Sequence, residues 1–289
     1  MIKITNIFPK NKNELDLVKF IGLYQYISSK DIQYFFNDTY YPKRISRLIK
    51  NKILRRYKKY LVLAKNGYTY LNLINQETTP LSYQKKYTDR LKFISHLVAM
   101  YHKNKYISFT PSFKIKNKTV FTESSRKYIG VLNIFGTNYL TYHISNEHTQ
   151  KYINSVIYDL QKETHYKNVI LLVNNIKRLN LRDFSFGFNS VIICEDNDKT
   201  LENLQYIQQI NWSKIITEFY NKDVHISEYN FCNYTNNKEK FITTFYYVDT
   251  EKINRIDNFL RNNPNKQADI ICNEQIVKLL RSRNTNSKF

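Results

Sequence analysis

Cysteine is rare in this chain, and its few copies form no recognisable site. Cys194, Cys232 and Cys272 are isolated, odd in number and lack the spacing of metal ligands. They favour a reduced cytoplasmic compartment over a secreted, disulfide-linked protein, and we interpret them as small buried hydrophobic side chains. Long apolar runs are also missing, since no uninterrupted stretch approaches the ~20 residues that span a bilayer. We expect a soluble cytoplasmic protein without a membrane partner.

Sequence motifs for common enzyme chemistry are missing as well. The chain has no P-loop, dinucleotide-binding fingerprint or nucleophile elbow, and its closest histidine pairs lack the i, i+4 spacing of helical zinc ligands. The densest acidic cluster, residues 195–198, follows a predicted strand, where acidic side chains are able to bind a metal. We interpret it instead as a solvated loop in which Asp198 or Thr200 caps the next helix. We therefore expect no catalytic residues, no metal and no cofactor.

The charge balance is strongly basic. Lys and Arg number 45 against 24 Asp and Glu, which gives a formal net charge of +21 at pH 7 and attracts phosphate backbones. The many Lys, Asn, Ile and Tyr residues, with only five Gly and five Pro, are also typical of AT-rich coding, which enriches Lys throughout a chain. Such a compositional bias would not remove acidic residues from one segment alone, yet no Asp or Glu occurs between Asp38 and Glu77.

The segment from Tyr40 to Tyr70 carries the strongest functional signal. Pro42 suits the first helical position, and apolar residues recur after it at helical spacing, which leaves a cationic outer face. More basic residues follow directly. We predict a DNA-binding surface that consists of Lys43, Arg44, Ser46, Arg47, Lys50, Arg55, Arg56, Lys58 and Lys59. The alternative interpretation is a solvated surface helix.

Three helices with short connections are predicted in the N-terminal region. Amphipathic spacing predicts the first at residues 14–26. A capping-box-like pair, Ser28 and Asp31, predicts a short second helix at residues 29–36, and the Pro42 helix is the third. In a winged helix-turn-helix, the third helix enters the major groove of DNA.

A basic hairpin is predicted after these helices. Strands at residues 53–57 and 60–63 flank a tip of two lysines. The Asn-Gly dipeptide at residues 66–67 predicts a turn with positive φ before a further strand at residues 68–73. Three helices followed by a hairpin are the order of a winged helix-turn-helix, whose wing touches flanking phosphates or the minor groove.

Arginine and lysine are expected to play different parts on this surface. Arg44 and Arg47 are the candidates for base edges, because a planar guanidinium can bind guanine through two hydrogen bonds. Lys43, Lys50 and the wing lysines suit point-charge contacts with phosphates.

Two parts of the chain resemble a known family. The segments ISSKDIQYFF and RISRLIKNKILRRYKKYLVLAKNGYTYL of this chain resemble the winged-helix half of the plasmid replication-relaxation proteins. In that family, a short basic wing ends in a strand and a Lys-x-Gly-Tyr element. The second half of that family, two strands and a long helix arranged like the core of a PD-(D/E)XK nuclease, is similar to residues 127–162, KYIGVLNIFGTNYLTYHISNEHTQKYINSVIYDLQK. The resemblance covers about residues 12–175.

The carboxylates of such a nuclease core are missing here. Residues 128–131 stand where the resemblance implies an Asp, and residues 142–145 stand where it implies a Glu. Metal-dependent cleavage needs clustered carboxylates to hold Mg²⁺, and His143 with Glu147 alone makes a poor Mg²⁺ site. We expect a domain that keeps the fold without its chemistry. The enzymatic alternative is a metal-dependent DNA nicking enzyme.

The C-terminal region alternates between predicted strands and helices, which predicts a sheet with helices on its faces. Strands are expected at residues 169–173, 191–194, 225–231, 243–248 and 268–272, and helices at 149–163, 200–209, 212–220, 250–262 and 274–283. The predicted fold is an α+β N-terminal winged helix-turn-helix followed by an α/β domain with a central mixed sheet. We predict domains at residues 1–78 and 91–289, joined by a polar linker at residues 79–90.

Together these features predict a sequence-specific double-stranded DNA-binding protein of a plasmid or other mobile element. Its winged helix would mark an origin for replication or transfer. Its second domain would form a homodimer or recruit replication or transfer proteins. A transcriptional repressor or a partition adaptor is the alternative within the same functional class.

Overall fold

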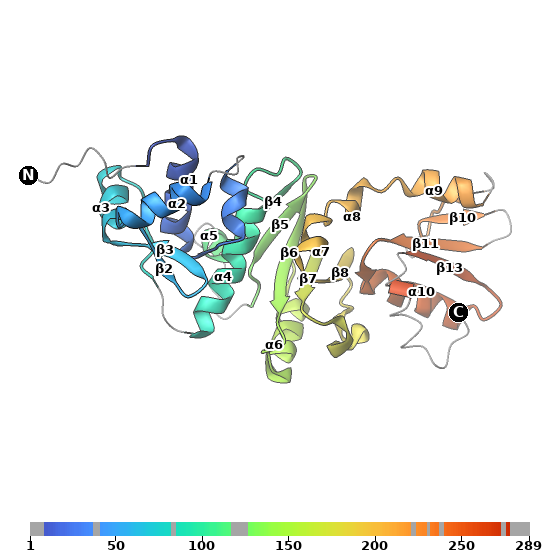
Figure 1. Ribbon diagram of the computed structural model, residues 1–289. Coiled ribbons are helices and arrows are strands. Elements are labelled where there is room, and N and C mark those ends of the chain that lie inside the picture. The colour runs from blue at the N-terminus through green and yellow to red at the C-terminus, as the bar shows by residue number, and fades with distance from the viewer. Residues whose placement is uncertain are drawn as a thin grey trace, which may run out of the picture. The chain divides into compact units, whose positions relative to one another are not determined.

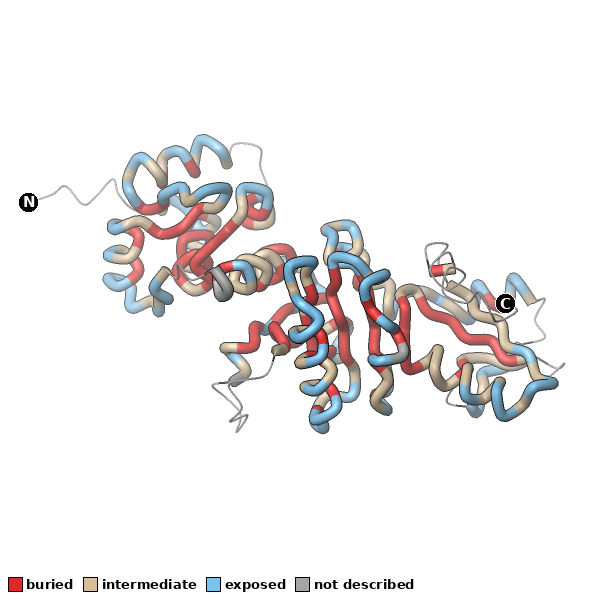
Figure 2. The backbone as a smooth tube through the Cα atoms, turned by 90° about the horizontal axis from the view of Figure 1, so that it is seen from below, coloured by how far each residue is buried: buried red, intermediate tan, exposed pale blue. Residues whose placement is uncertain are grey.

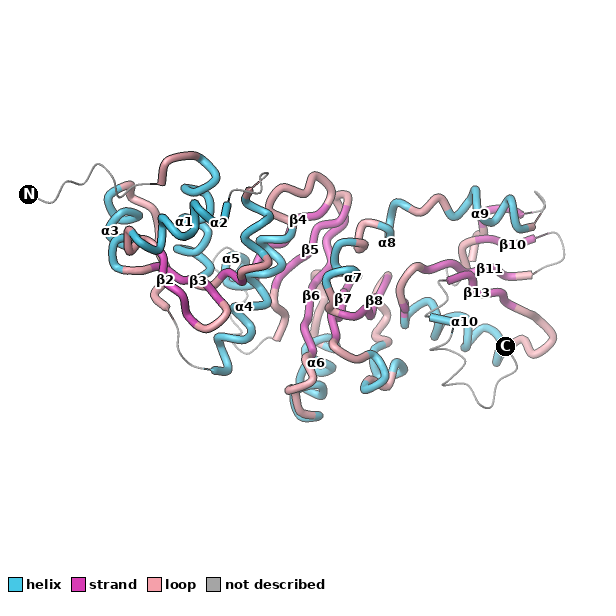
Figure 3. The backbone as a smooth tube through the Cα atoms, in the orientation of Figure 1, coloured by secondary structure: helices cyan, strands magenta, loops and turns pink. Residues whose placement is uncertain are grey.

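The computed structural model describes residues 9–36, 41–81, 85–116, 127–220, 224–229, 232–236, 240–272 and 276–277. By its internal contacts the chain divides into two compact units, residues 1–111 and 112–289. Figure 1 labels their elements, and Figure 3 marks helices, strands and loops along the backbone.

The first unit begins with a helix, a short strand, two helices and a hairpin. Its elements in chain order are α1 (Lys12–Tyr24), β1 (Ile27–Ser28), the 3-10 helix η2 (Asp31–Phe35), α2 (Tyr41–Lys50), β2 (Leu54–Tyr57), β3 (Tyr60–Leu63), α3 (Lys65–Leu73), α4 (Lys85–Met100) and β4 (Ile107–Pro111). An antiparallel sheet has the strand order β1-β3-β2. The predicted third helix and hairpin are confirmed, and the predicted second helix is a 3-10 helix.

Apolar side chains from all of these elements form the core of the first unit. Leu17 and Ile21 on α1 lie one turn apart and are buried, as the amphipathic spacing predicts. Leu48 on α2 and Leu61 on β3 are buried as well. Figure 2 shows the buried stretches along the backbone.

Residues 65–73 form helix α3, so the predicted turn at residues 66–67 and strand at 68–73 are wrong. The glycine of the Asn-Gly dipeptide is required for a different reason, the close packing of α3 against neighbouring backbone. A Cβ atom on Gly67 would lie 2.3 Å from the carbonyl oxygen of Ile53, so only glycine allows the helix to approach this backbone so closely. Close approach, not positive φ, explains the glycine.

Helix α4 belongs to the first unit, although most of it lies beyond the predicted linker at residues 79–90. The Ser95 hydroxyl donates a hydrogen bond to the carbonyl oxygen of Tyr26. The Nδ1 atom of His96 lies 2.8 Å from Oδ1 of Asp31. These contacts between distant parts of the sequence hold α4 within the first unit, which ends at residue 111.

The second unit contains helices and two mixed sheets. Its elements are α5 (Ser112–Lys116), β5 (Gly130–Ile134), β6 (Thr137–Ile144), α6 (Gln150–Gln161), β7 (Asn168–Val173), η3 (Ile176–Arg178), η4 (Leu181–Phe184), β8 (Ser190–Glu195), α7 (Asp198–Glu202), α8 (Tyr206–Gln209), α9 (Trp212–Phe219), β9 (Val224–Ile226), β10 (Tyr234–Asn236), β11 (Phe241–Phe245), β12 (Val248–Asp249), α10 (Thr250–Asn262) and β13 (Ala268–Cys272). The predicted mixed α/β organisation is confirmed, with two sheets where one was expected.

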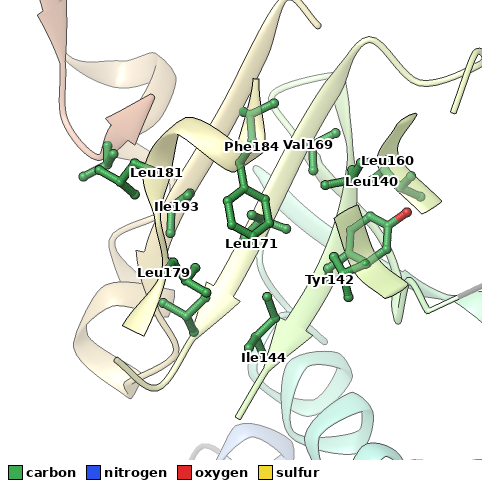
Figure 4. Close-up of a cluster of buried hydrophobic side chains, with 14 of the residues drawn as sticks. Leu140, Tyr142, Ile144, Leu160, Val169, Leu171, Leu179, Leu181, Phe184 and Ile193 are labelled. Atoms are coloured by element: carbon green, nitrogen blue, oxygen red, sulfur yellow. The ribbon is translucent and has the colours of Figure 1, made fainter. Parts of the chain in front are cut away.

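The larger sheet of this unit runs β12-β8-β7-β6-β5, with β6, β7 and β8 parallel and both flanking pairs antiparallel. After Asn168, the central strand β7 is a continuous run of buried apolar residues, as expected of a strand that is covered on both faces. Figure 4 shows Tyr142, Leu171 and Phe184 within the buried cluster that covers one face. The smaller sheet runs β13-β11-β10-β9, in which β13 and β11 are parallel.

Several predicted elements of the second unit differ in extent. The predicted helix at residues 200–209 is divided into α7 and α8, and the predicted strand at 243–248 is divided into β11 and β12. The predicted strand at 225–231 is reduced to β9 among the described residues, and most of the predicted helix at 274–283 lies outside them. Within the described residues, no helix combines the length and the apolar character that a membrane-spanning helix requires.

Candidate nucleic-acid interface

Helix α2 exposes polar and basic residues opposite the side chains that it buries. Ile45 and Leu48 are buried, whereas Lys43, Ser46 and Lys50 are exposed. The three exposed residues share one face because positions three, four and seven apart are neighbours on a helix. This face is the part of α2 that a DNA groove would meet.

Arg47 is held within the first unit. Its Nη2 atom donates a hydrogen bond to Oε2 of Glu14, a carboxylate on α1 that is only 1% exposed. The same oxygen accepts a hydrogen bond of 2.7 Å from the backbone N–H of Lys10. Asn11 caps α1 by accepting a bond of 3.0 Å from the N–H of Glu14. The ion pair therefore fixes α2 against the start of α1.

Arg44 is also engaged inside the first unit. It is half-buried, and its guanidinium carbon lies 5.7 Å from the centroid of the Phe36 ring, a cation–π distance. Both arginines assigned to base edges thus have partners within the protein, although their contact with bases stays a prediction. Local sequence could not reveal this, because Glu14 and Arg47 lie 33 positions apart.

The β2–β3 hairpin extends the basic surface. Tyr57 pairs with Tyr60, so Lys58 and Lys59 form a two-residue tip. Lys58 has a φ of 54°, in the left-handed region where a side chain costs about 1–2 kcal/mol. We define the basic face by its exposed members on α2 and the hairpin, which are Lys43, Ser46, Lys50, Arg55, Arg56, Lys58 and Lys59.

Aromatic side chains support the base of the hairpin. The Tyr26 ring centroid lies 6.2 Å from that of Tyr57 and 6.0 Å from that of Tyr60. Lys92 of α4 places its Nζ atom 5.1 Å from the Tyr60 ring centroid, and burial raises the pKa of the Tyr60 hydroxyl. Lys92 is a neighbouring cation that the sequence analysis missed, because it reaches the hairpin only through the tertiary packing of α4.

A hollow of about 300 Å³ opens beside α2 and the start of α1. We call it the α1–α2 hollow, and its lining residues are Lys10, Asn11, Glu14, Lys43, Arg44 and Arg47. Four of the six are cationic and one, Glu14, is a carboxylate. Lys10 was also missed by the sequence analysis, since no local pattern links it to α2.

A second polar cluster lies where the parallel strands β6, β7 and β8 end. His143 Nε2 lies 2.7 Å from Oδ2 of Asp196, and the amide of Asn174 donates to both oxygens of Asp196 at 2.7 and 2.6 Å. Ligands of α/β proteins often bind at this edge of a sheet. Here, however, the polar groups bond to one another.

The acidic loop at residues 195–198 caps the next helix through a residue that we did not expect. Asn197 Oδ1 accepts a hydrogen bond of 2.9 Å from the N–H of Thr200, so Asn197 is the N-cap of α7 and the predicted caps, Asp198 and Thr200, are wrong. Glu147 is exposed in the loop after β6. Among the described residues, no three or more His, Cys, Asp and Glu side chains gather as metal ligands would.

Comparison with known proteins gives no family assignment. No protein-family model, no curated protein and no solved structure matches the chain. The two strands and the helix expected within residues 127–162 are present as β5, β6 and α6, but their relation to a nuclease core remains a prediction.

Proposed function

We propose that this chain binds double-stranded DNA through a winged helix-turn-helix, with α2 in the major groove and the β2–β3 hairpin on the flanking backbone. One observation carries the proposal. The basic face is exposed on α2 and on the adjacent hairpin, and no acidic residue occurs in the sequence between Asp38 and Glu77. A surface of this kind is neutralised most effectively by a polyanion.

The order of the elements supports this proposal. The chain runs α1, β1, η2, α2, β2 and β3, and β1 pairs antiparallel with β3 through Ile27 and Leu61. Sequence patterns did not predict β1. Its pairing ties the segment between α1 and η2 to the hairpin and thereby holds the three helices and the wing as one unit.

The contacts of α2 suggest that some of its residues contact DNA and that others hold the helix in place. Lys43, Ser46 and Lys50 are exposed on the groove-facing side and would make the first contacts with phosphates and base edges. Arg47 would have to break its bond to buried Glu14 before it could bind guanine. We therefore assign Arg47 mainly to holding α2 at its docking angle.

The biological target follows from the resemblance to the plasmid replication-relaxation proteins. We propose an origin of replication or transfer on a plasmid or mobile element as the DNA site. The second unit would then serve self-association or the recruitment of replication or transfer proteins.

The test is fluorescence anisotropy of the full chain with duplexes from the neighbourhood of its own gene. Lys43→Gln/Lys50→Gln should weaken binding strongly. Lys105→Gln, which removes an exposed charge after α4, should have little effect. Tight binding that is insensitive to Lys43 and Lys50 would contradict the proposal, as would the absence of binding to any duplex.

A further inference from the structure

The lining of the α1–α2 hollow selects one kind of ligand. The six described lining residues are all polar or charged, and none of them carries an aromatic ring on which a base could stack. A volume of about 300 Å³ is roughly ten times the share of one water molecule in the liquid, which leaves room for a small hydrated group. The chemistry therefore favours a compact anion over a nucleobase.

The charge of the hollow is positive despite its carboxylate. Glu14 is 1% exposed, and its Oε2 atom already accepts hydrogen bonds from Arg47 and from the backbone N–H of Lys10. Arg47 compensates this charge directly. Three further cations, Lys10, Lys43 and Arg44, line the hollow, so its net charge is positive and attracts an anion.

Arg47 provides a second observation. Its Nη1 atom is buried, and among the described residues it has no hydrogen-bond partner. A buried guanidinium donor without a partner is unusual, because such groups normally find an acceptor. An anion in the hollow would supply acceptor oxygens next to this guanidinium, and a rotation of the Arg47 side chain would bring Nη1 into contact with them.

We propose that the α1–α2 hollow binds one phosphodiester group of the DNA backbone and so fixes the position of α2 along the groove. This inference rests on the proposed DNA-binding function. Arg44 and Lys43 lie on the same helix as the groove-facing residues, so a phosphate in the hollow is bound together with the duplex. A phosphate carried by bound DNA is present at a high effective concentration, which offsets the nearby Glu14 carboxylate better than free phosphate can.

The experiment replaces backbone phosphates one at a time with neutral methylphosphonate and measures binding by the full chain. Loss of one phosphate contact should weaken wild-type binding about eightfold at 0.1 M salt. The Lys10→Gln/Arg44→Gln variant has already lost the contacts of the hollow. At the backbone phosphate that occupies the hollow, methylphosphonate should therefore have little effect on DNA binding by this variant. Lys10→Gln alone should show the same pattern more weakly and leaves the Arg44–Phe36 contact intact. Lys105→Gln is the matched control and should respond like the wild type.

Other outcomes separate the two proposals. If the double variant and the wild type respond equally at every backbone position, the hollow proposal is overturned while DNA binding stands. A loss confined to one base sequence would make these residues base readers and would also overturn it. Pyrophosphate binding that needs Lys10 and Arg44 but does not compete with DNA would assign the hollow to a free anion instead. A wild-type chain that binds no duplex removes both proposals.

Discussion

The basic face of the first unit and the polar cluster at the ends of β6, β7 and β8 in the second unit are both rich in polar side chains. We call the latter, formed by His143, Asn174 and Asp196, the strand-end cluster. The partners of the side chains differ between the two regions. In the cluster, His143 bonds to Asp196, Asp196 bonds to Asn174, and Asn174 Oδ1 accepts a bond of 2.8 Å from the N–H of Asn146. On the basic face, lysines and arginines are exposed without a nearby carboxylate in the sequence. Polar content alone therefore does not mark a binding surface. Unbalanced charge is the more informative property.

The acidic residues of the second unit illustrate the same point. Glu251 is 2% exposed, and its Oε1 atom accepts hydrogen bonds of 2.6 and 3.2 Å from the N–H groups of Phe186 and Phe188. Asp249 is buried as well, which raises the pKa of its carboxyl group. These carboxylates hold loops and a helix in place. They are consistent with a structural role for the interior of this unit.

The largest expected effect is the loss of DNA affinity when four charges are removed from the basic face. In Lys43→Gln/Lys50→Gln/Arg55→Gln/Lys58→Gln, the slope of log K against log salt should flatten by roughly 3 to 4, about 0.9 per phosphate contact. Affinity at 0.1 M salt should fall by roughly four thousandfold. Fluorescence anisotropy over a salt series measures both.

The matched control for this variant removes the same charge from the second unit. Its substituted residues are all exposed lysines, namely Lys114, Lys151, Lys167 and Lys199, each changed to Gln. The slope should change far less in this control. Equal losses in the two variants would show that net charge attracts the DNA and that the basic face has no special part.

The next effect is a loss of stability from Arg47→Ala. The substitution leaves the buried Glu14 carboxylate without its guanidinium partner, so the free energy of unfolding should fall by about 3 kcal/mol. Lys43→Ala on the same helix should change it by less than about 0.5 kcal/mol. Chemical denaturation monitored by circular dichroism compares the two variants.

Arg47→Ala also decides between positioning and base reading. A lost base contact would cost about 1–3 kcal/mol on the specific site and much less on random DNA, with stability unchanged. That result would restore Arg47 as a base reader. Equal losses on both sequences, together with lower stability, would support its role in holding α2 against α1.

Sequence patterns predicted the local elements well and the long-range partners poorly. Helix α2 and the hairpin follow from the spacing of Ile45 and Leu48 and from the lysine tip, because these signals lie within a few residues. The Gly67 error has another cause. An Asn-Gly pair in isolation is typical of a turn, but here the glycine accommodates the Ile53 carbonyl group, which only the tertiary structure brings near.

The candidate site shows the same division. Exposure of Lys43 and Lys50 was predictable from helical periodicity, whereas the pairing of Arg47 with Glu14 joins elements 33 residues apart. The placement of Lys10 and Lys92 beside the basic surface depends on the packing of α1 and α4. No local pattern encodes such packing, so these residues required the structure.

A smaller effect is expected from His143→Ala in the second unit. The substitution leaves the half-buried Asp196 carboxylate without its imidazole partner, which should lower the stability of this unit by about 1–3 kcal/mol. DNA affinity should not change. Thermal denaturation and anisotropy measure the two quantities on the same sample.

The same variant tests whether the strand-end cluster has a chemical role. Supercoiled cognate plasmid is incubated with the wild-type chain and Mg²⁺ or Mn²⁺, and we expect no nicking. Nicking by the wild type that disappears in His143→Ala or Glu147→Ala would make the second unit an enzyme. The contrast between the two polar regions would then have to be abandoned.

The smallest effect is expected from Lys58→Gly, which tests whether the tip of the β2–β3 hairpin contacts DNA. Glycine adopts the φ of 54° at this position without the cost of about 1–2 kcal/mol that a side chain incurs, but it also gains freedom in the unfolded chain. The net result should be a gain in stability of about 0.5 kcal/mol. DNA binding should weaken at the same time, and the salt slope should fall by about 0.9 because one phosphate contact is lost.

Lys59→Gln, at the other tip position, removes the same charge without the backbone effect and should lower the slope with no gain in stability. If Lys58→Gly stabilises the protein and leaves the slope unchanged, then the tip lysine does not touch DNA, and the basic face ends at the strands of the hairpin.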